Sequence, residues 1–351
     1  MAFQYPPRLW GPSAMPKRHG NLFDQCFTPD VLHAAYLAAR RRKRKKVAVA
    51  AFERDLGANL QRLHDELHAG TYAPRPYVTF EVREPKPRLI HAPHFRDVVV
   101  QHAIYAAIYP IFDRGFIHDS YGCRKGKGTH RAADRAQQFL RDAPDGSVTL
   151  QMDIRKFFYR IDRARLMRLV ARRIKDRRLL ALLELFARYP DSTGIPIGNL
   201  LSQLFALIYL DPLDHFIKRE LGRKRYVRYV DDFIVFGIAS RAEANALRLQ
   251  IETFLHERLR LELSRYTIQP TRRGVNFVGF RAWRKTRFVR RHSLHTFSRS
   301  LRHGDVPSLV SIMGNARHSA SYAHFCRRLR SERPDLVPQL PEAHRHACTN
   351  L

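Results

Sequence analysis

The sequence has few cysteines, few acidic residues and no long hydrophobic run. Its 351 residues include four widely separated cysteines with no C-x-x-C pair, namely Cys26, Cys123, Cys326 and Cys348. This pattern is typical of free thiols in a reducing cytoplasm. Residues 1–20 contain no apolar core of a signal peptide, and the longest apolar run, Leu204–Leu210, is far too short to span a bilayer. We therefore expect a cytoplasmic protein without a membrane-spanning segment.

The shortage of acidic residues leaves the chain strongly basic. It has 63 lysines and arginines against 32 aspartates and glutamates, a formal net charge of +31. Such a protein repels itself unless a polyanion is near, and nucleic acid is the usual polyanion. A membrane surface is the alternative, but the charge is spread along the chain and not gathered on one amphipathic helix. The run of cations at Arg40–Lys46 is either a solvated face or a phosphate-contacting strip, and the global charge favours the strip.

Hydrophobic periodicity predicts a mixed fold. Helices are expected over residues 30–41, 49–68, 97–112, 129–141, 199–220 and 240–258, and strands over 77–82, 148–154 and 275–280. The helix over 199–220 should break or bend at Asp211-Pro212, because proline cannot donate a helical hydrogen bond. The end of the chain holds His344, His346 and Cys348, which is either a metal cluster or, as we expect, a polar, frayed terminus. The order of elements predicts an α+β fold with helices backing a sheet.

Two adjacent acids, Asp231 and Asp232, interrupt an otherwise apolar, strand-like stretch at residues 225–237. Burying a carboxylate costs several kcal/mol unless the charge is compensated. Asp153 ends another predicted strand, so the three acids can converge at the tip of a hairpin. Three carboxylates favour hard divalent cations such as Mg²⁺, and two such ions can serve a phosphoryl transfer. The alternative is structural, with one acid solvated and the other paired with an arginine.

With these acids in place, the sequence resembles the reverse transcriptases. Tyr229–Asp232 (YVDD) is similar to the family's Y-x-D-D motif, and Asp153–Phe158 (DIRKFF) is similar to its first palm motif. Pro85–Arg88 (PKPR), Ser120–Arg124 (SYGCR) and Asn276–Phe280 (NFVGF) match, in order, fingers motifs and the primer-grip region of bacterial and group II intron enzymes. The resemblance implies a right-hand polymerase with fingers, palm and thumb, in which helices back an antiparallel palm sheet.

The resemblance also implies a division into domains. These are a basic N-terminal extension (1–60), fingers (61–145), a palm (146–283) with a helical insertion at about 163–193, and a basic helical thumb (284–351). The roughly seventy residues after the primer-grip region are too few for a maturase domain followed by an endonuclease, so a full intron-encoded protein is not expected.

A variant motif narrows the resemblance. Most reverse transcriptases have Gln-Gly-x-x-x-Ser-Pro where this chain has Ile197, Gly198, Ser202 and Gln203. The variant resembles the reverse transcriptases of diversity-generating retroelements, which copy a template-repeat RNA into mutated cDNA for a variable gene. The family glutamine can hydrogen-bond near the template–dNTP pair and isoleucine cannot. We expect such a loss, worth about 1–2 kcal/mol, to lower base selectivity by about an order of magnitude and to favour errors opposite template adenines.

The resemblance assigns roles to individual residues. It implies that Asp153, Asp231 and Asp232 are catalytic and hold two Mg²⁺ ions together with the backbone carbonyl of Ile154. It places the dNTP against Lys86, Arg88, Ile154, Phe158, Ile197 and Gln203, with Phe158 as a steric gate against a 2′-hydroxyl and Phe157 in the core. It places template and primer against Arg124, Gly198, Ser202, Phe277 and Gly279. Many relatives have a lysine near Leu263–Thr267 that is proposed as a general acid, and Arg265 is not its equivalent.

The expected function is therefore an RNA-directed DNA polymerase that makes adenine-mutagenised cDNA from a template-repeat RNA. The expected partners are that RNA, its cDNA, dNTPs and a pentameric accessory variability determinant protein, in the cytoplasm of a bacterial host and without a membrane. The alternatives are another prokaryotic reverse transcriptase, from a retron, defence system or intron-like element, or an inactive RNA-binding scaffold. The sequence identifies neither the template RNA nor the target gene.

Overall fold

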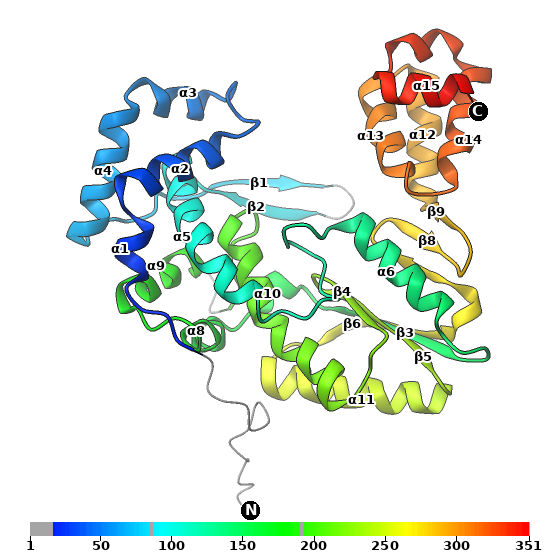
Figure 1. The fold of residues 1–351 in the computed structure, drawn as a ribbon, viewed down its shortest axis with the longest axis horizontal. Helices are drawn as coiled ribbons and strands as arrows, with labels where there is room; N and C mark the ends of the chain where they lie inside the picture. Colours follow the sequence, from blue (N-terminus) through cyan, green and yellow to red (C-terminus); the bar gives the residue numbers. More distant parts are fainter. Residues whose placement is uncertain (1–16, 84–86, 190–192, 351) are drawn as a thin grey trace, which may run out of the picture. The chain divides into compact units, whose positions relative to one another are not determined.

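The computed structural model describes residues 17–83, 87–189 and 193–350. The chain forms two compact units from interleaved segments. Unit 1 contains residues 1–115 and 158–209, and unit 2 contains residues 116–157 and 210–351. Figure 1 draws the helices and strands of both units. The domain boundaries expected from the sequence stay a prediction.

Unit 1 is mostly helical. Its elements are α1 (Leu22–Cys26), α2 (Pro29–Arg40), α3 (Val47–Arg54), α4 (Leu56–Ala69), β1 (Val78–Val82), β2 (Arg88–Ala92), α5 (Phe95–Asp113), α8 (Arg163–Ala171) and α9 (Arg177–Ala187). Strands β1 and β2 pair antiparallel as a hairpin, with Phe80 opposite Ile90. The single helix expected over 49–68 is wrong, because Asp55 leaves the helical conformation (φ −125°, ψ 50°) and separates α3 from α4.

Unit 2 is built on a four-stranded antiparallel sheet in the order β4-β5-β3-β6. The strands are β3 (Val148–Ile154), β4 (Tyr226–Tyr229), β5 (Asp232–Ile238) and β6 (Leu263–Pro270). Helix α6 (Thr129–Arg141) packs on β4 and β5, and helix α11 (Arg241–Leu259) packs on β3, β5 and β6 (Figure 1). The expected antiparallel sheet backed by helices is therefore confirmed. Helix α6 and strand β3 also begin and end where the sequence predicts.

Helix α10 (Leu200–His215) runs through Pro212 without a break and then widens into a π-helical turn at Phe216–Glu220. The expected break at Pro212 is therefore wrong, whereas the alternative of a bend there stays a prediction. By length and composition alone, the helical stretch Leu200–Glu220 could cross a membrane, although the uninterrupted apolar run within it, Leu204–Leu210, is much shorter. Most of it is buried inside the protein, as in a core helix.

A second, three-stranded sheet joins β7 (Val275–Phe277), β8 (Phe280–Ala282) and β9 (Arg287–Val289). The single strand expected over 275–280 is wrong, because Val278 and Gly279 adopt positive φ (43° and 90°) and turn the chain back. Such a two-residue turn suits a tight hairpin.

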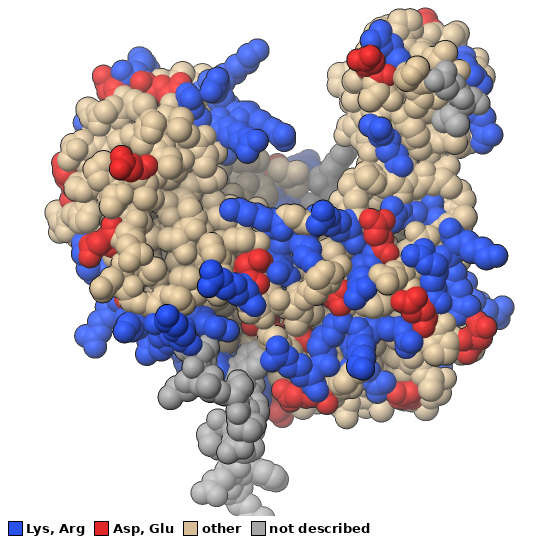
Figure 2. Space-filling model, in the orientation of Figure 1, with Lys and Arg blue, Asp and Glu red and all other residues tan. Residues whose placement is uncertain are grey.

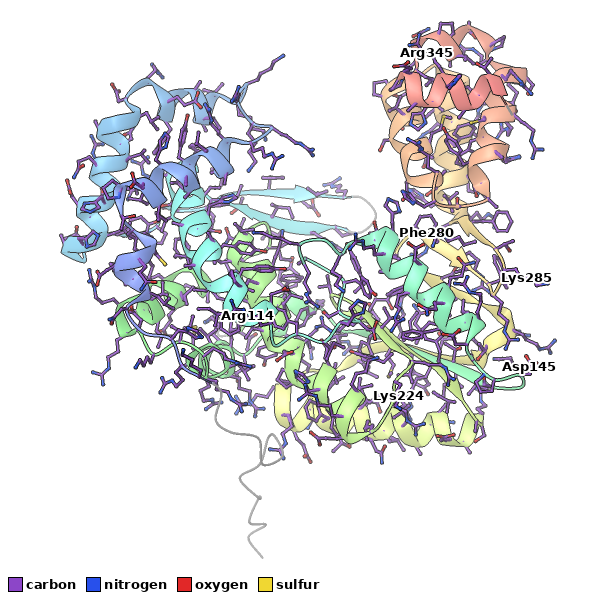
Figure 3. The ribbon with its side chains drawn as sticks, in the orientation of Figure 1. Arg114, Asp145, Lys224, Phe280, Lys285 and Arg345 are labelled. Carbon is purple, nitrogen blue, oxygen red and sulfur yellow. The ribbon has the colours of Figure 1, made fainter. Side chains whose placement is uncertain are left out.

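Four helices follow these strands, α12 (Arg291–His303), α13 (Val306–Ala316), α14 (Ser321–Glu332) and α15 (Glu342–Asn350). Their buried side chains form one apolar cluster with Phe280, which Figure 3 labels. The frayed terminus expected near His344 is wrong, because His344 and Cys348 are buried in α15. The Tyr322 hydroxyl lies 2.9 Å from His344 Nδ1 and helps to fix that helix.

Candidate active site

The three predicted acids lie together at one end of the main sheet of unit 2. Asp153 and Asp232 are direct partners across β3 and β5, although they lie far apart in the sequence. Asp231 occupies the two-residue turn between β4 and β5, because Tyr229 pairs with Asp232. Directly opposed residues have Cβ atoms about 5 Å apart, so three carboxylates are concentrated at this edge. The predicted convergence of the acids is confirmed.

The turn that carries Asp231 is strained and held from both sides. Val230 has φ 57°, which a β-branched residue adopts at a cost of about 1–3 kcal/mol. The backbone N–H of Ile154 donates to the carbonyl of Asp231 at 3.2 Å, and Arg228 Nη1 donates to the carbonyl of Val230 at 2.9 Å. These two hydrogen bonds hold the peptide groups on either side of the Asp231 side chain.

Arg228 is itself fixed by a buried carboxylate. Its Nε donates to Asp214 Oδ1 at 2.7 Å and its Nη2 donates to Asp214 Oδ2 at 2.5 Å. The Tyr226 hydroxyl donates to the same Oδ1 at 2.7 Å. Arg228 and Asp214 are 1% and 0% exposed, so breaking this pair would leave an uncompensated buried charge.

The segment Asp119–Gly122 lies against the same turn. Arg228 N donates to Asp119 O and Tyr121 N donates to Arg228 O, each at 2.9 Å, as in a short parallel bridge. A Cβ at Gly122 would lie 2.5 Å from Val230 Cγ2 and 2.8 Å from Val230 N. Only glycine allows this approach, so part of the predicted fingers motif supports the turn that carries Asp231.

Asp232 is partly buried and is held by hydrogen bonding. Gln151 Nε2 donates to Asp232 Oδ1 at 3.0 Å and to the carbonyl of Asn276 at 2.9 Å, which ties the acid to β7. Burial raises the pKa of Asp232 to about 6; Asp153 and Asp231 also raise it, whereas the Gln151 hydrogen bond and Arg290 lower it.

The side chain of Asp153 is 24% exposed. The Ser264 hydroxyl donates to Asp153 Oδ2 at 2.5 Å, and Arg265 Nε lies 3.9 Å from the same oxygen. The side chain of Arg265 is 72% exposed, so this ion pair is weak.

The donor set fits a hard cation. The three side chains offer carboxylate oxygens alone; burial first, and then repulsion by Asp153 and Asp231, raise the pKa of Asp232. Among the residues that the structure describes, no three Asp, Glu, His or Cys side chains are grouped closely enough to hold a metal ion, and this includes both the three aspartates and the His344–Cys348 region.

The other predicted residues fall into two groups, one in each unit. In unit 1, Arg88 and Gln203 are exposed, Phe158 and Ile197 are half-buried, and Ser202 is buried with no hydrogen-bond partner among the described residues. The carbonyl of Ile197 accepts from His91 N at 2.7 Å, which fixes this segment to β2.

Gly198 in the same segment has φ 113°. A Cβ there would lie 3.0 Å from Ile90 Cγ2 and 3.2 Å from His91 O. The positive φ and the close packing of this position on β2 explain why residue 198 is a glycine.

In unit 2, Ile154 and Phe277 are buried in the core, as is Phe157, whose expected core position is confirmed. Arg124 Nη1 donates to the carbonyls of Ile117 and Ser120 at 2.6 and 3.1 Å and so closes its own loop. Gly279 has φ 90° in the β7–β8 turn. Lys86 lies outside the described residues. The predicted contacts of these residues with nucleotide, template or primer stay predictions.

Sequence reasoning missed the residues that position the acids. Gln151, Asp214 and Arg228 have no motif of their own, and their contacts join segments far apart in the chain. One signal was available: Asp214 and Arg228 are charged residues in otherwise apolar stretches, as the acids themselves are.

Comparisons with known proteins agree with this arrangement. The family model described as "Reverse transcriptase (RNA-dependent DNA polymerase)" matches residues 82–282. The chain is 27% identical to Protein YkfC of Escherichia coli over 311 residues, covering 75% of this chain and 82% of that protein. It is 24% identical to the group II intron-encoded protein LtrA of Lactococcus lactis subsp. cremoris, covering 63% of this chain. The chain spans about half (49%) of the length of LtrA.

A solved structure of telomerase from Candida albicans, in complex with a fragment of telomeric RNA, aligns with a TM-score of 0.49 and 10% identity. The alignment covers 76% of this chain and 57% of the telomerase chain.

Proposed function

Because the chain belongs to the reverse transcriptase (RNA-dependent DNA polymerase) family, we propose that it copies RNA into DNA at the acidic end of the β4-β5-β3-β6 sheet. The observation that carries this proposal is the convergence of Asp153, Asp231 and Asp232 from two segments of the chain. The buried arginine of this region, Arg228, binds Asp214 and the backbone of the turn that carries Asp231.

Members of this family generally use divalent metal ions. We propose two Mg²⁺ ions, held by Asp153, Asp231, Asp232 and the carbonyl of Ile154. Bound there, the ions would activate the primer 3′-hydroxyl and neutralise charge on the triphosphate. The chain's own contribution is to hold the carboxylates in place: Arg228 and Ile154 fix the turn, and Gln151 and Ser264 orient individual carboxylates.

The surface charge supports a nucleic-acid substrate. On the face in view in Figure 2, Lys and Arg side chains far outnumber those of Asp and Glu. This agrees with the formal net charge of +31. A polyanionic template and product would offset the self-repulsion of such a chain.

Within the family, we propose a mutagenic enzyme of the diversity-generating type. The supporting observation is Ile197, an apolar side chain where most reverse transcriptases have glutamine. Its backbone is fixed by the hydrogen bond from His91 N, so a substitution at this position changes the side chain and leaves the backbone contact in place. The proposed substrate is a template-repeat RNA. The proposed partner is the pentameric accessory protein, in the cytoplasm of a bacterial cell.

The test is Ile197→Gln, with sequencing of cDNA made on an RNA template of defined composition. We expect errors opposite template adenine to fall by about tenfold, because the restored amide adds a polar contact worth about 1–2 kcal/mol. Ile197→Val is the matched control and should keep the error pattern. Unchanged adenine errors in Ile197→Gln, with normal cDNA yield, would contradict the mutagenic assignment.

A second candidate is a reverse transcriptase of the intron type, which the similarity to LtrA favours. An enzyme of this type would catalyse the same reaction without an excess of errors opposite template adenine. The same cDNA sequencing therefore distinguishes the intron-type enzyme from the mutagenic one. Primer extension with Asp231→Ala as control tests the third reading, an inactive RNA-binding scaffold. Equal incorporation by both proteins would contradict the metal assignment.

A further inference from the structure

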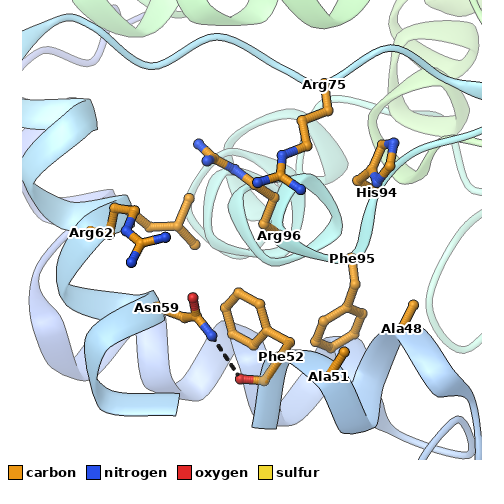
Figure 4. Close-up of a pocket in the computed structure, with 10 residues that line it drawn as sticks. Ala48, Ala51, Phe52, Asn59, Arg62, Arg75, His94, Phe95 and Arg96 are labelled. Atoms are coloured by element: carbon orange, nitrogen blue, oxygen red, sulfur yellow. Dashed lines mark hydrogen bonds between the residues drawn. The ribbon is translucent and has the colours of Figure 1, made fainter. Parts of the chain in front are cut away.

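Unit 1 contains a concave site that the proposed polymerase chemistry does not use. It is a pocket of about 290 Å³ between α3, α4 and the start of α5 (Figure 4). Its lining residues are Ala48, Ala51, Phe52, Asn59, Arg62, Leu63, Arg75, His94, Phe95 and Arg96. This volume lies at the lower end of the range for small-ligand sites, so the pocket has room for about one nucleotide and not for a duplex.

One side of the pocket is cationic. Figure 4 shows the side chains of Arg62, Arg75 and Arg96 directed toward the same space. Arg96 is engaged, because its Nη1 and Nη2 donate to Glu66. Arg62 and Arg75 are exposed, and their guanidinium groups form no ion pair or hydrogen bond with any residue that the structure describes. Two free arginines therefore face the pocket.

The helix α5 adds to this field. Its first residues, His94, Phe95 and Arg96, line the pocket, and α5 is 19 residues long. The N–H groups of Phe95 and Arg96 belong to the first turn, which has no intrahelical acceptors, and His94 provides no side-chain cap. A helix N-terminus of this kind attracts phosphate oxygens. The helix dipole and the two free arginines point to the same type of ligand, an anion.

The opposite side of the pocket is aromatic. Phe52 is half-buried, and its ring lies 5.3 Å from that of Phe95 in an edge-on arrangement. It also stacks on Tyr36, with ring centroids 6.2 Å apart. An aromatic surface beside free arginines suits a nucleotide, which has a planar base and an attached phosphate.

The backbone position of Arg75 is fixed from the core. Asp97 is buried, and its Oδ2 accepts from the backbone N–H of Arg75 at 3.0 Å, while its Oδ1 accepts from the Tyr72 hydroxyl at 2.6 Å. The backbone of Arg75 is therefore held against α5, and only its side chain must order when a ligand binds. This lowers the entropic cost of binding.

The surroundings of the pocket favour a polymer over a free nucleotide. Arg41–Lys46 immediately precede α3, which forms one wall, and all six are exposed cations. Arg40 is the exception in the predicted run, because its Nη1 donates to Tyr36 and Glu53. A strand that left the pocket could continue along these six cations, whereas a free nucleotide would make no use of them.

We propose that this pocket binds one unpaired nucleotide of a single-stranded RNA, with its phosphate on Arg62, Arg75 and the α5 N-terminus and its base against Phe52. The site would hold the RNA template with residues of unit 1, whereas the acidic end of the sheet belongs to unit 2. This rests on the proposed function only in taking RNA as the chain's natural polyanion.

The experiment measures binding of a fluorescein-labelled, unstructured 20-nucleotide RNA to the full-length protein by anisotropy, over a range of salt concentrations. We expect Arg62→Gln/Arg75→Gln to lower affinity by about tenfold at 0.15 M salt. It should also reduce the slope of log affinity against log salt by about 1.4, because two phosphate contacts on a single strand are lost. The control Arg54→Gln/Arg219→Gln removes the same charge from exposed sites outside the pocket and should leave the slope unchanged. Equal slopes and affinities in the two double variants would overturn the proposal.

Phe52→Leu tests the base contact separately. We expect about tenfold weaker binding with an unchanged salt slope, since stacking and not phosphate neutralisation is lost. The arginine variants carry the proposal if Phe52→Leu fails to fold. If the pocket instead bound free nucleotides, Arg62→Gln/Arg75→Gln would lose dATP binding but would bind RNA as tightly as the control double variant. That result would also overturn the proposal.

Primer extension on a short RNA template separates this proposal from the proposed function. If the wild-type protein makes no cDNA but the arginine variant still loses RNA affinity, the pocket stands and the polymerase assignment fails. If the wild-type protein makes cDNA and the pocket variants bind RNA as tightly as their control, the polymerase assignment stands and the pocket proposal fails.

Discussion

The raised pKa of Asp232 gives a quantitative test of the site. Burial raises the pKa of its carboxyl from 3.8 to about 6, and the carboxylates of Asp153 and Asp231 raise it as well. At 1.36 kcal/mol per pH unit, this difference corresponds to a folded-state penalty of at most about 3 kcal/mol for the charged form. Asp232→Asn removes the charge, and its side-chain oxygen can still accept the hydrogen bond from Gln151.

The direction in which stability changes with pH follows from the pKa of the Asp232 carboxyl in the unfolded state, 3.8, and in the folded state, about 6. Below pH 3.8 the carboxyl is protonated in the folded and unfolded states, so its charge costs nothing. As the pH rises to about 6, the unfolded state ionises first and the folded state loses stability. Above about pH 6 the penalty is fully present. We therefore expect metal-free Asp232→Asn to be more stable than wild type by up to about 3 kcal/mol at pH 7.5, and by much less at pH 4.5.

Urea unfolding in EDTA, followed by tryptophan fluorescence, measures this difference. The chain has two tryptophans, and Trp283 belongs to the same unit as Asp232. Replacing Trp10 by Phe would make Trp283 the sole reporter. Asp145→Asn removes an exposed carboxylate of the same unit and serves as the control for charge alone. An Asp232→Asn advantage of the same size at pH 4.5 and 7.5 would refute the reasoning, because burial would then not control the carboxyl.

Added Mg²⁺ extends the test to the metal site. A ligand at tenfold over its Kd stabilises the folded state by about 1.4 kcal/mol. We expect wild type to gain this stability at pH 7.5 and Asp232→Asn to gain less, because one carboxylate is lost. The gain in wild type should shrink below about pH 6, where protons compete with the metal for Asp232.

Three further substitutions test the residues that hold the acids in place. Gly122→Ala places a methyl 2.5 Å from Val230 Cγ2, so we expect primer extension to slow by at least tenfold while thermal unfolding shows the protein still folded. Arg228→Met leaves a buried carboxylate unpaired and should lower the free energy of unfolding by about 3–5 kcal/mol, as measured in urea. Gln151→Leu removes the donor to Asp232, so the carboxyl pKa should rise and the acid limb of the pH–rate profile should move to higher pH. Unchanged rates for Gly122→Ala, unchanged stability for Arg228→Met or an unchanged profile for Gln151→Leu would each contradict the positioning role of that residue.

Local patterns predict much of the fold. Helix α6 and strand β3 agree with the sequence prediction at both ends, because periodicity and end signals act within a few residues. The acidic hairpin is also predictable, because charged residues in an apolar strand need a special environment. The errors have local causes too: Asp55 interrupts one helix, and Val278 takes a positive φ that no propensity predicts for a β-branched residue.

The contacts that position the acids could not be predicted. The pair of Asp214 and Arg228 and the approach of Gly122 to Val230 join segments that periodicity treats separately. The motif at Ser120–Arg124 matches a fingers pattern in the sequence alone. Its contact with the turn before Asp231 is a property of the folded chain and required coordinates.

Residues in unfavourable backbone conformations and carboxylates that repel one another occur together at the acidic end of the sheet. A β-branched residue takes φ 57° at Val230, and Lys156, just beyond β3, takes φ 44°. Carboxylates that repel one another lie beside them. Each departure costs free energy. They occur beside a buried arginine, Arg228, that binds the carbonyl of Val230 itself. Strain at a turn and buried charge at the same turn, both stabilised by long-range contacts, are what a site needs when it must hold mutually repelling carboxylates close together for a cation.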